Sequence, residues 1–570
     1  MKRVFNLLLM VMVALCVGAC ASSEQKKHVE KLEGSSFNVD APTTVLYDNN
    51  EPVAAAYMNI NDLLDKCGFT ENQRKLIAAA VISDIEEPDV REYVQSVIAN
   101  LDNSGIKFSE PVYATFNMDF KSDIEEPSFE FIMVAEVSNA NTLDMLAEKS
   151  ELALDTKDGV RSIDINNDYS CITIGYDSNH FVVAASSEDV ANELFYNTIK
   201  SADVNLSAFM GRDVALYINF EKGMKMYERN LYRSIKKQRQ IADNSHNIYE
   251  VEDAEWMIDD LNNQLEQLAV IKENVGDDIK AIFGLRFDDG RIVLDVHCEG
   301  GSDKYADMWK VVDGDNLKYV PGSAIGVVNI GVAGEAVVNV VKGFMTPDAE
   351  SALANYMDIS VNELRPMMTI AYDAVSSING DLTIALNYLN VREDYVYEYG
   401  EYVETETIDL ELLAMANVVN NYIIDNVSLI PIFKQTASGD GYYFEYDYDG
   451  VINVGQLDNT LYLGVNASCK KPIGDSIASK WAGEFDDSIG YLAVDFQNLL
   501  SMPMVKKFVN ELCFDEDYET AQNIKSTLGL FDSVWFNLRN NKSAEFVVTM
   551  SNKETNALAQ LVNHFLKMAI

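Results

Sequence analysis

The chain has 570 residues, of which 48% are hydrophobic and only 11 are proline, a composition typical of folded rather than disordered protein. Its formal net charge of −46 repels phosphate backbones, so we expect no nucleic-acid partner. The length is sufficient for two to four domains.

The first residues have the pattern of a lipoprotein signal peptide. Lys2 and Arg3 precede a mostly apolar run, residues 4–17, that is too short to span a bilayer comfortably as a permanent helix. Small residues lie just before Cys20, as lipoprotein signal peptidase requires, whereas bulky Leu15 lies before Cys16. We expect residues 1–19 to be removed and Cys20 to receive a diacylglycerol and an amino-linked acyl chain such as palmitate. Several acyl chains would anchor the protein stably.

Residues 20–40 are mostly polar and are predicted to be the anchor and a flexible tether. No later segment has eighteen uninterrupted apolar residues, so we expect a tethered protein and not a spanning one. The five further cysteines are scattered without C-x-x-C spacing, which predicts no zinc site and no disulfide framework. No cofactor is expected.

Four stretches run from an alternating or apolar strand into a polar residue and then into helical spacing. The polar residues lie where side-chain oxygens can cap the first amides of a helix, and they are Asn59, Asn219, Asn329 and Asp495.

A strand meander over residues 160–186 has a counterpart over residues 442–468, and strand-to-helix stretches lie before and after each. Corresponding positions are separated by nearly constant intervals, which predicts two tandem related halves at 41–312 and 317–570. The alternative is that strand-then-helix matches arise by chance in any chain of this class. The predicted fold class is α+β, with mostly antiparallel sheets covered by helices.

The segment from about 223 to 275 has helical spacing and is predicted to form a projecting helical hairpin. Its first part, residues 222–239, holds seven basic residues against a lone glutamate, a basic island in an acidic protein. This island is either an ordinary solvated face or a contact for acidic lipid headgroups or for the protein's own acidic surface.

The layout resembles a family of large exported lipoproteins of Gram-negative gut bacteria that is classed as a domain of unknown function. The resemblance rests on the lipidation motif, on "AAAYMNINDLLDKCGF" and on "FIMVAEVSNANTLDMLAEK", and it covers nearly the whole mature chain. The family implies location and architecture but no catalytic residues.

The sequence contains no H-E-x-x-H, G-x-S-x-G or phosphate-loop motif, so we predict no catalytic and no metal-binding residues. The candidate binding residues are four tyrosines in an acidic stretch: Tyr395, Tyr397, Tyr399 and Tyr402. Strand alternation would display the odd-numbered ones on one face as a platform for sugars or for a partner's strand. The alternative is a plain hairpin whose tyrosines cover the core.

These observations predict a lipid-anchored cell-envelope protein that acts as a non-enzymatic binding or assembly module. Its expected partners are the membrane, through the lipid on Cys20, and an envelope protein or a glycan. Ala21 fits sorting to the outer membrane, and the lack of an acidic cluster after Cys20 favours the periplasmic face over the cell surface. The alternative is an envelope hydrolase acting on glycans with carboxylates from separate strands.

Overall fold

The computed structural model describes most of the chain beyond the expected tether. The described residues are 52–69, 88–119, 128–149, 152–166, 171–187, 190–200, 209, 211–398, 401–439, 441–446, 450–467, 469, 472–481, 483–512, 518–540 and 542–569. They form two compact units. Unit 1 ends at Ser302 and also includes the residues from Lys553 onward, and unit 2 is Asp303–Asn552. These units differ at their boundaries from the expected ranges 41–312 and 317–570, because the last helix packs with unit 1.

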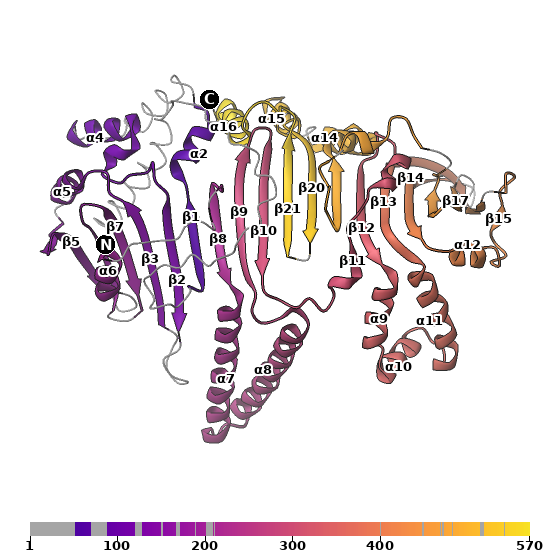
Figure 1. The fold of residues 1–570 in the computed structure, drawn as a ribbon, viewed down its shortest axis with the longest axis horizontal. Coiled ribbons are helices and arrows are strands. Elements are labelled where there is room, and N and C mark those ends of the chain that lie inside the picture. Colours follow the sequence, from indigo (N-terminus) through magenta and orange to yellow (C-terminus); the bar gives the residue numbers. More distant parts are fainter. Residues whose placement is uncertain are drawn as a thin grey trace. The chain divides into compact units, whose positions relative to one another are not determined.

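Unit 1 is an antiparallel sheet with the strand order β10-β9-β8-β1-β2-β3-β7-β6-β5-β4 (Figure 1). Its elements are β1 (Ala54–Met58), α2 (Ile60–Lys66), α4 (Pro88–Ala99), η2 (Leu101–Ser104), β2 (Val112–Asp119), β3 (Ser128–Glu136), α5 (Ala140–Lys149), β4 (Asp155–Lys157), β5 (Val160–Asn166), β6 (Cys171–Tyr176), β7 (His180–Ser186), α6 (Ala191–Lys200), β8 (Val214–Asn219), α7 (Phe220–Asn244), α8 (Ile248–Val275), β9 (Lys280–Asp288), β10 (Arg291–Glu299) and α16 (Ala557–Ala569).

Unit 2 is an antiparallel sheet with the order β21-β20-β19-β12-β13-β14-β18-β17-β16-β15, and β11 pairs with the end of β12. Its elements are η4 (Ala306–Met308), β11 (Trp309–Lys310), η5 (Asp315–Tyr319), β12 (Gly326–Ala333), α9 (Gly334–Phe344), α10 (Pro347–Tyr356), α11 (Val361–Ser376), β13 (Ile378–Glu398), β14 (Glu401–Val418), α12 (Tyr422–Val427), β15 (Lys434–Gln435), β16 (Gly441–Tyr446), β17 (Gly450–Leu457), β18 (Thr460–Val465), η6 (Ile477–Ser479), β19 (Gly490–Asp495), α13 (Phe496–Ser501), α14 (Pro503–Leu512), α15 (Tyr518–Leu528), β20 (Phe531–Asn540) and β21 (Ser543–Met550).

The predicted mixture of helices and mainly antiparallel strands is confirmed. Local turn chemistry explains several of the pairings. Asp158 and Gly159 both have positive φ, as a two-residue hairpin turn between β4 and β5 requires. Asp289-Gly290 also connects two paired strands, β9 and β10, where Asp288 pairs with Arg291, and here only Gly290 has positive φ.

Three of the four expected helix caps are confirmed. The side chains of Asn59, Asn219 and Asp495 accept hydrogen bonds from the first-turn amides of α2, α7 and α13. The expectation for Asn329 is wrong. Asn329 lies in the middle of β12, four residues before that strand ends, and its side chain is fully buried.

Asn329 instead joins a buried polar cluster. Its Nδ2 donates to Asp381 Oδ2 at 2.8 Å, and its Oδ1 accepts from the Thr383 hydroxyl at 3.0 Å. The Asp381 carboxylate also accepts from the amides of Asp313 and Gly314. The cluster thus ties β12 and β13 to the segment before η5, and it satisfies polar groups that are costly to bury alone.

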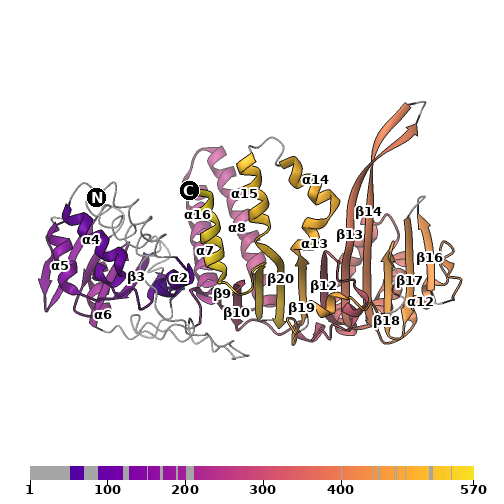
Figure 2. The ribbon, with the colours of Figure 1, turned by 90° about the horizontal axis from the view of Figure 1, so that it is seen from above.

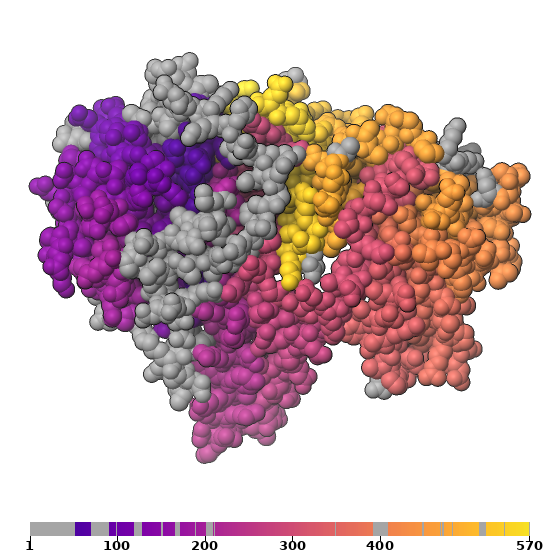
Figure 3. All heavy atoms as spheres, viewed as in Figure 1, coloured from indigo at the N-terminus to yellow at the C-terminus, as the bar shows by residue number. Residues whose placement is uncertain are grey.

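The two helices α7 and α8 form the expected hairpin, and the expected range 223–275 lies almost wholly within them. They pack along each other through buried Leu231 and Ile235 on α7 and Ala254 and Leu268 on α8. Figure 1 shows the hairpin extending beyond the end of the sheet of unit 1, and Figure 3 shows it as a lobe. In the part of the chain that the structure describes, no helix is both long enough and apolar enough to cross a membrane.

The C-terminal helix α16 completes unit 1. The Gly290 amide donates to the Thr555 carbonyl at 2.9 Å, and Asn556 Nδ2 donates to the Phe287 carbonyl at 2.6 Å, so the turn between β9 and β10 holds the start of this helix. Ala557 and Ala559 are buried.

The buried cluster predicts an unusual pH dependence. Burial raises the pKa of the Asp381 carboxyl, and hydrogen bonds from Asn329 and the Asp313 amide oppose this rise only in part. Folded protein therefore holds this proton to higher pH than the unfolded chain does, and wild type loses stability as pH rises from the unfolded pKa through the folded one. Relative to Asp381→Asn, the stability of wild type should fall as pH rises above about 4, the ordinary pKa of an aspartate carboxyl.

The measurement is hydrogen exchange of β12 and β13 amides in both proteins at a series of pH values from about 4 upward. Parallel pH curves for the two proteins would show that Asp381 titrates as it does in the unfolded chain.

Candidate binding surfaces

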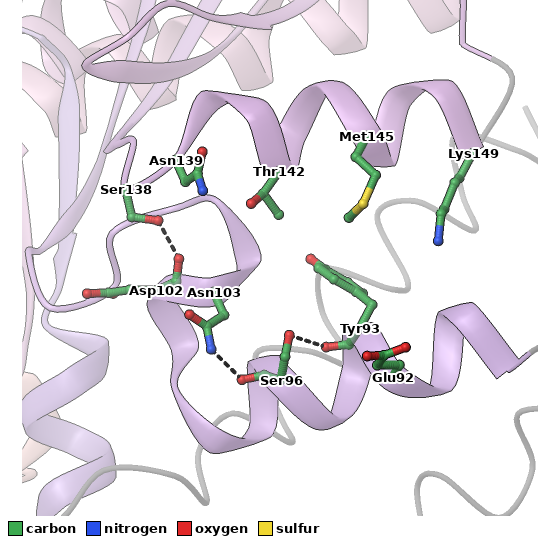
Figure 4. A pocket seen from close by; sticks show the side chains of 10 residues that line it. All are labelled: Glu92, Tyr93, Ser96, Asp102, Asn103, Ser138, Asn139, Thr142, Met145 and Lys149. Atoms are coloured by element: carbon green, nitrogen blue, oxygen red, sulfur yellow. Dashed lines mark hydrogen bonds between the residues drawn. The ribbon is translucent and has the colours of Figure 1, made fainter.

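Unit 1 contains a groove of about 860 Å³ between α4, η2 and α5. Figure 4 shows α4 and α5 facing each other across it, with Tyr93 pointing into the space between them. Its lining is mostly hydroxyl, amide and charged groups: Glu92, Tyr93, Ser96, Asp102, Asn103, Ser138, Asn139, Thr142, Met145 and Lys149. Helical spacing on α5 brings Thr142, Met145 and Lys149 to the same side.

Hydrogen bonds between the walls preform this groove. Asn103 Nδ2 donates to the Ser96 carbonyl at 2.8 Å and so ties η2 to α4. The Ser138 hydroxyl donates to the Asp102 carbonyl and ties the start of α5 to η2. Because these side chains are already engaged, a ligand would meet a fixed polar surface, which lowers the entropic cost of binding.

Tyr93 separates the groove from an apolar cavity of about 80 Å³ behind it. Its hydroxyl donates to the Ser104 carbonyl at 3.3 Å, and burial raises its pKa to about 12. The cavity is lined mainly by apolar side chains of the unit 1 core, among them Phe108, Leu143 and Phe181. The side chain of Tyr93 therefore has one polar contact and a largely apolar environment.

The two carboxylates of the groove do not face each other. The Asp102 carboxylate accepts from the amide and the hydroxyl of Ser109, at 3.2 Å and 3.0 Å. It points away from the groove, whereas Glu92 lies on α4 at the other end (Figure 4). Among the described residues, no group of three or more His, Cys, Asp and Glu side chains is arranged to hold a metal ion.

A second candidate surface is one face of the unit 2 sheet. Directly paired residues cross seven strands and form what we call the apolar row: Phe546, Phe536, Leu492, Val328, Ile384, Ala414 and Leu463. Its five largest side chains remain 39–43% exposed. On the same face, the paired residues two positions to either side are all Val, Leu, Ile, Ala or Gly.

The opposite face of the same sheet is covered. Phe485 stacks on Tyr491 with ring centroids 3.9 Å apart, and its edge meets Trp535 at 5.7 Å. Tyr491 and Trp535 lie on β19 and β20, next in sequence to the row residues Leu492 and Phe536. Strand alternation therefore places buried aromatics on one face and the exposed apolar row on the other.

Three of the four candidate tyrosines, Tyr395, Tyr397 and Tyr402, lie where β13 and β14 extend beyond the neighbouring strands as a two-stranded ribbon (Figure 2). The backbone pairs Tyr397 with Tyr402 and Tyr395 with Glu404. Tyr399 and the side chains of the other three lie outside what the structure describes, as does Cys20. The proposed roles of all five residues stay predictions.

Neither the groove nor the apolar row was found by sequence reasoning, although signals for both exist. "EVSNANTLDMLAEK" has the pattern of a strand, a turn and a helix, and it supplies Ser138, Asn139 and Thr142 to the groove. Strands such as "FVVTM" and "IGVVNIGV" are apolar at nearly every position, which indicates two apolar faces.

The fold and these surfaces define a large α+β protein with antiparallel sheets and candidate binding surfaces. The chain matches the family described as "Domain of unknown function (DUF4836)" over residues 44–558, and it belongs to that family. No curated protein and no solved structure matches it.

The position of Tyr93 predicts different effects for two substitutions. Tyr93→Ala should cost about 3 kcal/mol, because it opens the polar groove to the apolar cavity. Tyr93→Phe should cost less than about 1 kcal/mol, because it keeps the ring and loses one long hydrogen bond. Urea unfolding followed by hydrogen exchange in α4 and α5 measures both, and equal costs would contradict this account of the ring.

Proposed function

We propose that the protein is a lipid-anchored cell-envelope protein, tethered through Cys20, that acts by binding and assembly and not by catalysis. The observation that carries this proposal is the apolar row, which lies across seven strands of the unit 2 sheet and keeps its five largest side chains 39–43% exposed. Contiguous exposed apolar surface of this kind marks interaction sites in soluble proteins. An apolar surface is suited to a protein partner more than to a glycan, whose hydroxyls would lose their hydrogen bonds to water there.

The size of the row is consistent with a partner contact. Five side chains that are about 40% exposed each have about 1 kcal/mol of burial left to gain, or about 5 kcal/mol together. Association and ordering cost a comparable amount. A stable contact therefore needs the whole row, and removal of two central residues should abolish it.

The groove supports a subsidiary binding role. Its walls are preformed and its polar groups suit a ligand with hydroxyl or amide groups. A glycan hydrolase would need an acid and a second carboxylate facing the same bond, and here Ser109 holds the Asp102 carboxylate away from the groove. The geometry of the groove therefore favours binding over hydrolysis.

We also propose that the two units descend from a tandem duplication. In chain order, the ten strands from β1 to β10 take the same places in their sheet as the ten strands from β12 to β21 take in theirs. An exposed apolar position corresponds as well, since Leu216 on β8 is 41% exposed and its counterpart in the row is Leu492 on β19, which is 43% exposed. The same order of ten strands is improbable without common origin.

Protease treatment of intact cells tests the location. We expect protection until the outer membrane is opened, and we expect Cys20→Ser to release the protein from the membrane fraction. Cleavage on intact cells would place it on the outer face and contradict the periplasmic location. Retention of the Cys20→Ser variant in the membrane would contradict the lipid anchor.

Photo-crosslinking in cells tests the assembly role. A crosslinking amino acid placed at Ile384 or Leu492, in the row, should give a defined larger species. The same amino acid at Val419 should not, because Val419 is 60% exposed but lies outside the row. Ile384→Glu with Leu492→Glu should remove the partner contact while leaving thermal unfolding close to that of wild type, since both side chains already face solvent. Equal crosslinking from all three positions would count against a specific surface.

A further inference from the structure

A short loop joins α12 to β15 at the edge of the unit 2 sheet (Figure 1). It has four consecutive exposed apolar residues, Leu429, Ile430, Pro431 and Ile432, which we call the apolar loop. Leu429 is 76% exposed, Ile430 43% and Ile432 55%. Apolar side chains exposed singly are ordinary on a protein surface, whereas contiguous exposed apolar residues mark contacts with a protein or a membrane.

The backbone of the apolar loop is largely bonded within its own segment. Pro431 has no amide hydrogen, and four neighbouring amides donate to carbonyls of residues 424–430 at 3.1–3.2 Å: those of Ser428, Leu429, Ile430 and Phe433. A backbone amide that is already bonded can leave water at low cost. Hydrocarbon imposes this condition on any segment that enters it.

The base of the apolar loop is held to the sheet and has amphipathic side chains. The Phe433 ring packs on Phe444 of β16, with ring centroids 6.2 Å apart. Lys434 donates to Glu445 at 3.3 Å, and its Nζ lies 5.8 Å from the centre of the Tyr443 ring. Lysine and tyrosine favour the boundary between lipid and water. The segment thus has an apolar tip above a base suited to lipid headgroups.

The sequence around the apolar loop is free of carboxylates. Residues 426–439 contain no aspartate or glutamate, although 90 of the 570 residues are acidic, and Lys434 is the only charged residue among them. A carboxylate in the loop would be costly to bring into hydrocarbon. This stretch can therefore approach a lipid surface without that cost.

We propose that the apolar loop inserts into the phospholipid surface to which the protein is tethered, and so holds the α12 end of unit 2 at the membrane. This inference rests on the proposed lipid anchor, which keeps the protein at that surface. A bilayer accepts an apolar tip of any shape, whereas a protein partner needs a matching pocket and polar groups that fix orientation. The four residues of the loop have no polar side chain to supply such a contact.

The strength of this contact matches that of a tethered protein. Each large side chain of the loop gains up to about tenfold in affinity when it leaves water, and three of them together reach an affinity near 1 mM. A short flexible tether supplies an effective concentration of about the same size. The loop therefore inserts when the protein is anchored and binds only weakly when it is not.

Tryptophan quenching by phospholipid with brominated acyl chains tests the insertion. The mature chain, with a hexahistidine tag in place of Cys20, is held on phosphatidylcholine vesicles by a nickel-chelating lipid, so the test does not depend on acylation. The fluorescence that Ile432→Trp adds to that of wild type should be quenched by the bromine. Adding Leu429→Glu to Ile432→Trp should reduce the inserted fraction about tenfold or more, because it replaces an apolar contact with a charge.

A matched control is Ile370→Trp on α11, because Ile370 is 53% exposed but lies outside the loop. Its added fluorescence should not be quenched. Raising salt to about 0.5 M should leave quenching at residue 432 unchanged, since apolar burial and not charge drives insertion. Equal quenching at residues 370 and 432, or none at 432, overturns the proposal.

Two further outcomes separate this proposal from the others. Ile384→Glu with Leu492→Glu should leave quenching at residue 432 unchanged, so the apolar row and the apolar loop can fail separately. Quenching at residue 432 together with retention of Cys20→Ser in the membrane fraction of cells would contradict the lipid anchor alone. An unquenched Ile432→Trp, with a defined protein adduct from a photo-crosslinking amino acid at residue 432 in cells, would identify a protein as the partner instead.

Discussion

The strands of unit 2 carry apolar side chains on both faces of the sheet, and both faces must be accounted for. On one face, Phe485 covers Tyr491 and Trp535 and closes a core. On the other face, the five largest side chains of the apolar row stay about two-fifths exposed. A sheet with one solvated face normally alternates apolar and polar residues along each strand. The strands of unit 2 lack that alternation, and for this reason we propose an assembly role for this unit.

Polar side chains on the covered face of that sheet form a buried cluster joined by hydrogen bonds. Asn329 and Asp381 are buried, and their hydrogen bonds run to each other, to Thr383 and to the backbone before η5. Buried polar groups in such a network fix the register of the elements that they join, because a shifted strand would leave them unsatisfied. The cluster therefore sets the position of β12 against β13, and with it the alignment of Val328 and Ile384 on the exposed face.

Sequence reasoning succeeded where the signal is local. The caps at Asn59, Asn219 and Asp495 and the helices between residues 223 and 275 all follow from spacing and from the preferences of single residues. Asn329 was misassigned because its partner Asp381 is 52 residues away and no local pattern indicates it. The groove was missed for the same reason, since α4 and α5 meet only after the chain has passed through two strands. Cys20 and the ribbon tyrosines depend on features that the structure does not describe.

The return of the last helix to unit 1 bears on how the protein reaches its folded state. Residues 553–569 supply α16 and the contacts of Thr555 and Asn556 with the β9–β10 turn, although the rest of unit 1 ends at Ser302. A chain that is synthesised from its N-terminus leaves unit 1 without this helix until about 250 further residues have been made, whereas unit 2 has all of its own strands by then. Unit 1 is therefore completed only after unit 2 has been made, although most of unit 1 is synthesised first, so its last packing step joins segments about 250 residues apart.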